Sequence, residues 1–256
     1  MKRYWLGTVG LIALGMAAPA SAADLGARPY VRALPPPIAA IYDWTGFYIG
    51  INGGGGSTHT CFDLLSDALG EVGGPEGCNN ANGGTVGGQI GYRWQTGSWV
   101  WGIEGQGNWA DFSSSRASLL FPTAVINSKI DSFGLITGQV GYAWNNVLFY
   151  IKGGAAVTGN KFEVVDPTVP LDVTANTTRW GGTVGLGLDF GFAPNWSIGV
   201  EYDHLFMGSR DLNLTGTAQG TAFFQTEHIS QDVDIGLVRL NYRFGGWGAP
   251  PVAARY

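Results

Sequence analysis

The alternation of apolar and polar side chains over residues 84–109 constrains the fold more than any other feature of this sequence. Two arms, separated by a short turn at residues 95–98, each place their apolar side chains at every second position. The apolar positions are Val86, Ile90, Tyr92, Trp94, Trp99, Trp101, Ile103 and Trp109. A period of two puts successive side chains on opposite faces of a β-strand. The segment therefore predicts a β-hairpin with one apolar face and one polar face.

The aromatic residues of this hairpin crowd around its turn. Tyr92 and Trp94 precede the turn, and Trp99 and Trp101 follow it. A soluble sheet that packs one face on a core would show the same alternation. Aromatic side chains at the ends of strands are, however, typical of the level at which a membrane-spanning strand meets lipid headgroups. We therefore interpret the pair of strands as a transmembrane hairpin whose apolar face contacts lipid.

The same hairpin pattern recurs twice along the chain. The sequence GQIGYRW at residues 88–94 is echoed by GQVGYAW at residues 138–144, and a third copy runs from Gly181 through a turn at residues 193–195. Aromatic residues flank each short turn and also the end of the last strand. The predicted belt consists of Tyr92, Trp94, Trp99, Trp101, Tyr142, Trp144, Phe149, Phe190, Phe192, Trp196, Tyr242 and Phe244.

The connections between alternating segments are long and short in turn. Long segments near residues 55–82, 111–128, 160–176 and 209–230 are expected to be external loops, and the short turns are expected to face the periplasm. Eight strands of about 9–11 membrane-spanning residues fit this pattern. A barrel must close, since an open edge in lipid leaves backbone groups without partners. We predict an all-β fold, an eight-stranded antiparallel up-and-down transmembrane β-barrel.

One segment permits a helical alternative. Residues 132–151 contain no charged side chain over a length that could span a membrane as a helix. The glycines of this segment and the Asn145–Asn146 pair at its centre favour a hairpin instead.

The ends of the chain differ in composition from the barrel. Residues 1–22 combine Lys2 and Arg3 with an apolar stretch and the small residues Ala20–Ala22, which is typical of a cleaved signal peptide. Residues 23–43 are rich in proline and are expected to form a periplasmic lead-in, followed by the barrel at 44–244 and a tail at 245–256. The formal net charge is −5, so a nucleic-acid partner is not expected.

The two cysteines lie in the first long segment. In an exported protein an even number of cysteines indicates a disulfide, so Cys61 and Cys78 are predicted to be bonded and to restrain the loop. Two free thiols or a metal-binding pair are the alternatives. A metal site would need a partnering cluster of histidines and cysteines, which the sequence does not show.

Charged residues on the alternate face of the strands are expected inside the barrel. They are Arg93, Glu104, Lys152, Arg179, Asp189, Glu201, Asp203, Arg239 and Arg243. Since an unpaired buried charge is costly, Lys152 and the arginines are expected to meet Glu104, Glu201 and Asp203. An eight-stranded barrel is narrow enough for side chains to fill it. We therefore expect a filled lumen, and a solute path lined by the same groups is the alternative.

Candidate catalytic and cofactor motifs are weak. His228 and Ser230 lie two residues apart on one face, as a barrel-type lipid deacylase requires. Glu227 faces the opposite way, and no glutamate on the following strand is available to orient the imidazole. His59, His204 and His228 are scattered and are expected to be surface residues, so no enzyme activity, metal or cofactor is expected.

Several of these motifs resemble one known group of proteins. The signal-peptide end ASAAD, the first strand WTGFYIGINGGGG, the GQIGYRW hairpin and the final NYRF are similar to small outer-membrane β-barrel proteins of alphaproteobacteria. These are the surface-antigen or porin family proteins, which are related to the barrel of outer membrane protein A. The resemblance implies location in a Gram-negative outer membrane, assembly by the barrel-insertion machinery, and a role in envelope integrity or surface interactions. Some relatives are credited with haem binding, for which this sequence has no motif.

The C-terminal end departs from the family pattern. Family barrels end on an aromatic residue, and Tyr242 and Phe244 match that spacing, but the chain continues to Tyr256. The position where the family has glycine is Arg239. From the sequence we expect a structural, non-enzymatic barrel that contacts outer-membrane lipid, lipopolysaccharide and, through its external loops, neighbouring proteins or host surfaces. A narrow porin for small solutes and a haem- or ligand-binding surface receptor are the alternatives.

Overall fold

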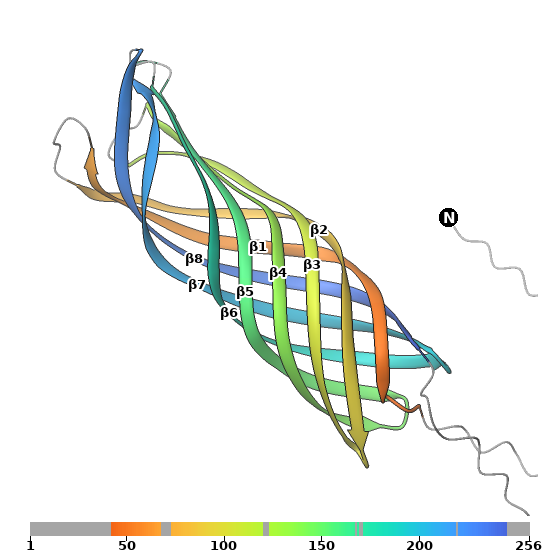
Figure 1. Ribbon diagram of the computed structural model, residues 1–256. Helices are drawn as coiled ribbons and strands as arrows, with labels where there is room; N and C mark the ends of the chain where they lie inside the picture. The colour runs from red at the N-terminus through yellow and green to blue at the C-terminus, as the bar shows by residue number, and fades with distance from the viewer. Residues whose placement is uncertain are drawn as a thin grey trace, which may run out of the picture. The chain divides into compact units, whose positions relative to one another are not determined.

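The computed structural model describes residues 42–67, 73–119, 123–166, 168, 171–218 and 220–244. In this part of the chain eight antiparallel strands close into a barrel in sequence order (Figure 1). They are β1 (Gly46–Asp67), β2 (Gly74–Thr96), β3 (Trp99–Ala117), β4 (Val125–Trp144), β5 (Val147–Asp166), β6 (Leu171–Ala193), β7 (Trp196–Ala218) and β8 (Thr221–Arg243). The predicted fold class is confirmed, and no described helix is long and apolar enough to cross a membrane.

The predicted N-terminal and C-terminal segments fall largely outside this part of the chain. The signal peptide at 1–22, most of the lead-in at 23–43 and the tail at 245–256 lie outside the described residues. Tyr42, at the end of the predicted lead-in, is described and is buried in the barrel.

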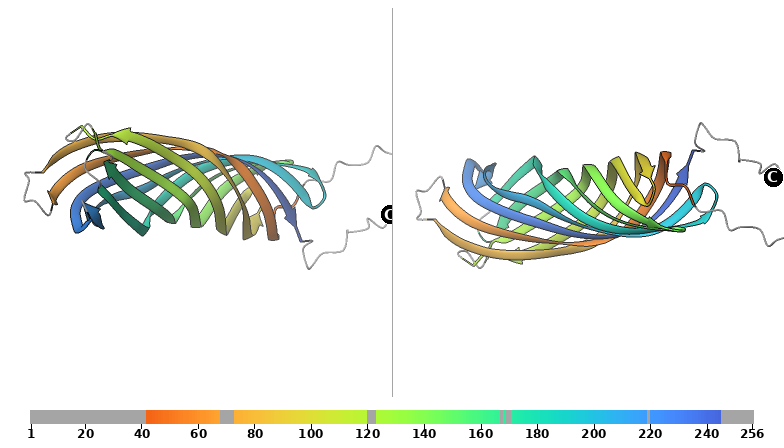
Figure 2. Two further views of the ribbon diagram at one scale, coloured as in Figure 1. Left: turned by 90° about the horizontal axis from the view of Figure 1, so that it is seen from above. Right: turned by 90° about the horizontal axis from the view of Figure 1, so that it is seen from below.

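The short connections β2–β3, β4–β5 and β6–β7 gather at one end of the barrel, which we call the inner end (Figure 2). Backbone hydrogen bonds join each turn to the next strand pair, as from Ala143 N–H to Ser98 O at 2.7 Å and from Gly191 N–H to Asn146 O at 2.8 Å. Asn145 has a φ of 53°, which the two-residue turn between β4 and β5 requires and which asparagine tolerates. Each residue of the predicted aromatic belt lies outward near this end and is exposed or half-buried.

A second ring of aromatic residues lies farther along the strands. Trp109 on β3, Trp180 on β6 and Phe206 on β7 point outward and are 75%, 58% and 49% exposed. We call this ring the outer belt and the predicted ring the inner belt. Ten residues separate Trp99 from Trp109, which at a tilt near 45° corresponds to roughly 25 Å, the height of an outer-membrane apolar band. The part of the barrel between the two belts is therefore its membrane-spanning part.

The structure contradicts the predicted external loops. Residues 55–82, 111–128, 160–176 and 209–230 were expected to be loops, but most of them continue the strands, which have 19 to 23 residues each. We call this region beyond the outer belt the outer extension. There the side chains still alternate, but the apolar ones point inward and the polar ones outward, which reverses the arrangement in the membrane-spanning part. Phe62, Phe162 and Leu214 are examples of the inward apolar residues. Water replaces lipid outside the membrane, so the apolar residues are buried inside the barrel.

One part of the barrel wall lacks its backbone ladder. The pairing of β6 with β7 stops at Thr174 and Thr215 and resumes at Gly182 and Phe206. A bulge between Phe206 and Ser209 in the β7–β8 ladder lies at the same place, and Gly208 within it has a φ of 64°. Residues 175–181 and 207–214 therefore border an interruption between two neighbouring strands.

Candidate functional site: the barrel lumen

The lumen is filled by layers of different chemistry along the barrel. The inward side chains of β5 pass through these layers in order from the inner end: Leu148, Tyr150, Lys152, Ala156, Thr158, Asn160, Phe162 and Val164. They define an inner apolar layer, a charged layer, a middle apolar layer, a polar layer and an outer apolar layer. The inward residues of β8 show the same succession from Arg239 to Ile229.

The inner apolar layer closes the inner end of the barrel. It consists of Tyr42, Trp44, Val100, Ala143, Leu148 and Tyr150. The backbone N–H of Trp44 donates to Gln95 Oε1 at 2.8 Å, and the backbone N–H of Tyr42 donates to Asn146 Oδ1 at 3.3 Å. The segment before β1 thus folds into the barrel mouth and covers the charged layer.

Lys152 lies among three carboxylates in the charged layer. Its Nζ is 2.8 Å from Glu201, 3.1 Å from Asp203 and 3.7 Å from Glu104. All four side chains are buried. Strands β3, β5 and β7 supply these residues, so the ion pairs join three parts of the barrel wall across the lumen.

Arg239 completes this group of charges. Its guanidinium forms ion pairs with Glu104 and Glu201 and donates to the hydroxyl oxygen of Tyr150 at 2.7 Å. Tyr150 in turn donates to Glu201 at 2.6 Å, and Tyr48 donates to Glu104 at 2.6 Å. Arg239 is 0% exposed, so its charge is balanced by these carboxylates rather than by solvent.

Arg93 forms a separate ion pair nearby. Its Nη1 is 2.9 Å from Asp189 Oδ2, and its Nε donates to Gln139 Oε1 at 3.1 Å. The guanidinium also lies 4.7 Å from the ring centre of Tyr48 and 5.2 Å from that of Tyr150. Aromatic rings and a carboxylate together hold this arginine across the lumen.

Glycines opposite the large side chains make these contacts possible. A Cβ at Gly187 would overlap the ring of Tyr150, and one at Gly199 would overlap the carboxylate of Asp189. The strands therefore leave space on their inner faces where a neighbouring side chain crosses.

The apolar layers were not predicted. The middle layer contains Ala81, Phe112, Ile130, Phe133, Leu135, Ala156, Leu205, Met207, Val233, Ile235 and Leu237. The outer layer contains Phe62, Ala124, Ile126, Phe162, Val164, Val173, Leu214 and Ile229. The outer layer could have been found from the exchange of the alternating pattern outside the membrane, where apolar residues take the register of the inward charges. The middle layer lies partly in the membrane-spanning part, where Leu135 points inward and Ile136 outward, so both faces are apolar there.

Two of the predicted lumen arginines form no ion pair with a carboxylate among the described residues, contrary to the prediction. Arg179 donates through Nη2 to backbone oxygens of Gly208 at 2.8 Å and Ile229 at 3.1 Å, beside the interruption between β6 and β7. The missing ladder leaves carbonyl groups that its guanidinium satisfies. Arg243 is half-buried at the inner end and donates to Thr45 O and Pro194 O, both at 3.0 Å. Each arginine thus bonds to backbone at an irregular part of the wall.

The cysteines form a disulfide, although not in a loop. Cys61 and Cys78 are direct ladder partners on β1 and β2, and their bond lies on the outward face of the outer extension. His59 Nε2 lies 3.4 Å from Cys61 Sγ, but both sulfur atoms are committed to the disulfide. The bond restrains a strand pair rather than the flexible loop that the sequence suggested.

The histidine and serine motif has a partner that sequence reasoning missed. Asp211 Oδ1 lies 2.6 Å from His228 Nδ1, because Asp211 and His228 are ladder partners on β7 and β8. The preceding strand therefore supplies an orienting carboxylate. Among the described residues, however, no hydrogen bond joins His228 to Ser230. The group lies outward in the outer extension and close to the outer belt, because Asp232, two positions after Ser230, is the ladder partner of Phe206.

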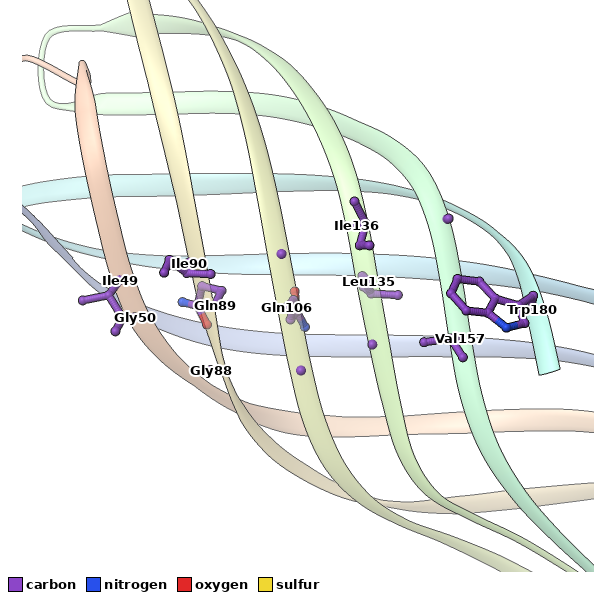
Figure 3. A pocket seen from close by; sticks show the side chains of 14 residues that line it. Ile49, Gly50, Gly88, Gln89, Ile90, Gln106, Leu135, Ile136, Val157 and Trp180 are labelled. Atoms are coloured by element: carbon purple, nitrogen blue, oxygen red, sulfur yellow. The ribbon is translucent and has the colours of Figure 1, made fainter. Parts of the chain in front are cut away.

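A groove of about 590 Å³ lies on the lipid-facing side of the barrel (Figure 3). Its walls include Ile90, Ile136 and Trp180, and glycines such as Gly88 and Gly107 form its floor. Gln89 and Gln106 of the lumen lie beneath that floor. The groove is open to the membrane and is a feature of the outer surface, not a passage through the lumen.

The chain is similar to a family and to individual proteins that are all described as outer-membrane proteins. The family described as "Outer membrane protein beta-barrel domain" matches residues 9–244. The 31 kDa outer-membrane immunogenic protein of Brucella melitensis is 28% identical over 79% of this chain and 85% of its own length. The 22 kDa outer membrane protein of Rhizobium leguminosarum is 28% identical over 70% of this chain and 71% of its own length.

Among solved structures, the outer membrane protease OmpT from Escherichia coli is similar with a TM-score of 0.52. The alignment covers 78% of this chain and 97% of that one, at 11% sequence identity. At this identity the likeness extends to the fold alone.

Proposed function

Because the chain belongs to the outer membrane protein β-barrel family, we propose that it is a structural, non-conducting barrel of the Gram-negative outer membrane. In this role the membrane-spanning part anchors the protein, and the outer extension contributes to envelope integrity and surface interactions. Export by a cleaved signal peptide and assembly by the barrel-insertion machinery belong to the same proposal.

The succession of filled layers in the lumen supports a non-conducting barrel. An ion crossing the lumen would have to separate the Lys152 and Arg239 ion pairs and then pass two layers of apolar side chains. Desolvating an ion in such layers is costly. A narrow porin would need polar groups along its whole length, and the lumen alternates polar and apolar layers instead.

The outward face of the outer extension supports surface interactions. Directly outside the outer belt, Lys129 and Lys161 are ladder partners on β4 and β5, where two cations lie side by side. Asp111 lies 2.9 Å from Lys129, and Asp131 lies 3.1 Å from Lys161, whose hydrogen bond lowers the pKa of Asp131. A polar hollow of about 680 Å³ adjoins the lysines and is lined by Ser113, Asn127 and similar residues. Phosphate groups of lipopolysaccharide lie at this level and would bind these cations.

Planar-bilayer recording tests the proposal. Purified, refolded protein is expected to give no large, stable openings at either polarity. A variant with Phe112, Leu205 and Ile235 changed to alanine thins the middle apolar layer and is expected to remain silent, because the charged layer still fills the lumen. Large, voltage-resolved openings from the wild-type protein would favour the porin instead.

Two further measurements test the other functions. A haem titration is expected to show no Soret shift, and a saturable shift would support the receptor. Incubation with lipid A is expected to release no acyl chains. Release that is lost in a Ser230→Ala variant would show that Asp211, His228 and Ser230 form a catalytic group.

A further inference from the structure

Two buried carboxylates face the lumen in the outer extension without a cation. Glu76 on β2 is 3% exposed and Glu227 on β8 is 0% exposed. One carboxylate oxygen of each, Oε2, is buried and has no hydrogen-bond partner, and neither residue forms an ion pair within the described part of the chain. An unpaired buried carboxylate is costly, and two in one place are costlier because their charges repel.

The strand pairing brings these carboxylates together. Strand β1 lies between β2 and β8, and its Leu64 is the ladder partner of Glu227. Glu76 occupies the extra position of a β-bulge, since Phe62 pairs with Gly77 and Asp63 pairs with Pro75. A bulge redirects one side chain, and here it turns Glu76 inward. Two strand spacings, about 10 Å between backbones, separate the two glutamates, so their side chains can approach one ion from opposite sides.

Polar groups surround the carboxylates on the same level. The hydroxyl of Ser118 donates to Glu76 Oε1 at 3.2 Å, and the amide of Gln225 donates to Glu227 Oε1. Burial and the neighbouring charge of Glu76 raise the pKa of Glu227 to about 7. The two carboxylates therefore interact electrostatically across β1.

The sequence around the site offers no basic partner. The outer ends of the hairpins, residues 62–77, 117–125, 164–174 and 214–228, contain seven acidic residues and no lysine or arginine. The guanidinium of Arg116 lies beside Gly77, but it donates to the backbone oxygen of Cys78. The excess of acidic residues favours cations at this end, and no ion pair neutralises Glu76 or Glu227 among the described residues.

We propose that Glu76 and Glu227 bind a calcium ion between them inside the outer extension. Calcium takes six to eight oxygen ligands in flexible geometry, so it accepts carboxylates from two strands together with hydroxyl, amide and water oxygens. Magnesium demands a stricter octahedron and dehydrates reluctantly. The ion would join β2 to β8 across β1 and close the outer end of the barrel.

The test is a calorimetric titration of the full chain, refolded in detergent at pH 8 after treatment with EDTA, with calcium chloride as the probe. The wild type is expected to bind one calcium ion per chain. Glu227→Gln and Glu76→Gln, which keep the size of the side chain, are each expected to weaken binding at least tenfold. Asp63→Asn is the matched control, since Asp63 lies at the same level of β1 but points outward. It is expected to change the affinity less than twofold.

Hydrogen exchange gives a readout that does not depend on binding heat. Calcium is expected to slow exchange in residues 60–67, 74–80 and 225–230 of the wild type and to have no effect there in Glu227→Gln. Heat-modifiable migration confirms that each variant is folded. Absence of saturable calcium binding by the wild type would overturn the proposal, as would equal binding by the Glu76→Gln, Glu227→Gln double variant. Either result leaves the non-conducting barrel untouched.

Discussion

Arg239 connects four strands of the barrel across the lumen. It bonds to Glu104, Glu201 and Tyr150, from strands β3, β7 and β5, while lying on β8 itself. The sequence placed this arginine inward by its position in the alternating pattern of the last strand. Its partners lie 38, 89 and 135 positions away in the chain, so no local pattern could identify them.

Replacing Arg239 with methionine is expected to destabilise the barrel by about 3–5 kcal/mol, because Glu104 and Glu201 would lose a buried counter-charge. Denaturant unfolding in detergent or liposomes, followed by tryptophan fluorescence, measures the change. The control is Arg210→Met, since Arg210 is exposed and its loss should alter stability by less than about 0.5 kcal/mol. Equal stability of the two variants would show that the charged layer is not a source of stability.

At the scale of elements, the hairpin of β1 and β2 departs from the prediction, because a loop was expected where both strands continue. Cys61 and Cys78 had been expected to restrain a loop, whereas they join two residues that already pair in the ladder. The sequence therefore predicted the bond correctly but not the structure around it. Thr, Asn and Gly residues in this segment resemble a loop in composition, and only the inward register of Phe62 and Leu64 indicates a strand.

Changing both cysteines to alanine is expected to increase hydrogen exchange in residues 57–67 and 74–82 and to leave the membrane-spanning part unchanged. The cross-link has a sequence separation of 17 residues, for which chain entropy predicts a loss of about 3 kcal/mol. Wild-type protein under reducing conditions should show the same local change. Unaltered exchange in this hairpin would mean that the ladder alone holds it.

The interruption between β6 and β7 is the second irregular element. Arg179 bonds to backbone oxygens there, so Arg179→Met is expected to leave carbonyl groups unsatisfied. Loss of charged hydrogen bonds of this kind costs about 1.5–3 kcal/mol. Faster exchange in residues 207–214 would report the local opening. Arg210→Met, beside the same interruption, should have little effect, and an equal effect of both variants would argue against a bracing role for Arg179.

For the whole molecule, the two aromatic belts define where lipid contacts the barrel. In liposomes made with lipids brominated on the acyl chains, tryptophan fluorescence is expected to be strongly quenched, because most tryptophans point outward near or between the belts. Trp44 is buried in the inner apolar layer and should retain its emission. A variant that keeps only Trp44 is the control. Weak quenching of the full set would contradict a lipid-facing apolar surface.

The sequence by itself determined the alternating strands of the membrane-spanning part and the face on which each predicted belt residue and lumen charge lies, because a period of two assigns each side chain to one of two faces. It did not identify the inward Glu76 and Glu227 of the outer extension. The family resemblance stated from its motifs is confirmed by the match over residues 9–244. The pattern does not state whether lipid or water lies outside the wall. That is why segments beyond the outer belt were expected to be loops, and why the outer apolar layer was missed.

Only the tertiary structure decided which inward residues meet. Barrel closure fixes the stagger between strands, and a shift of two residues in one ladder keeps every side chain on its face while moving its partner by about 7 Å. The contacts of Lys152 with three carboxylates, the bond of Arg179 to backbone, and the bulge that turns Glu76 toward Glu227 all depend on that stagger. Alternation along one strand contains no information about it.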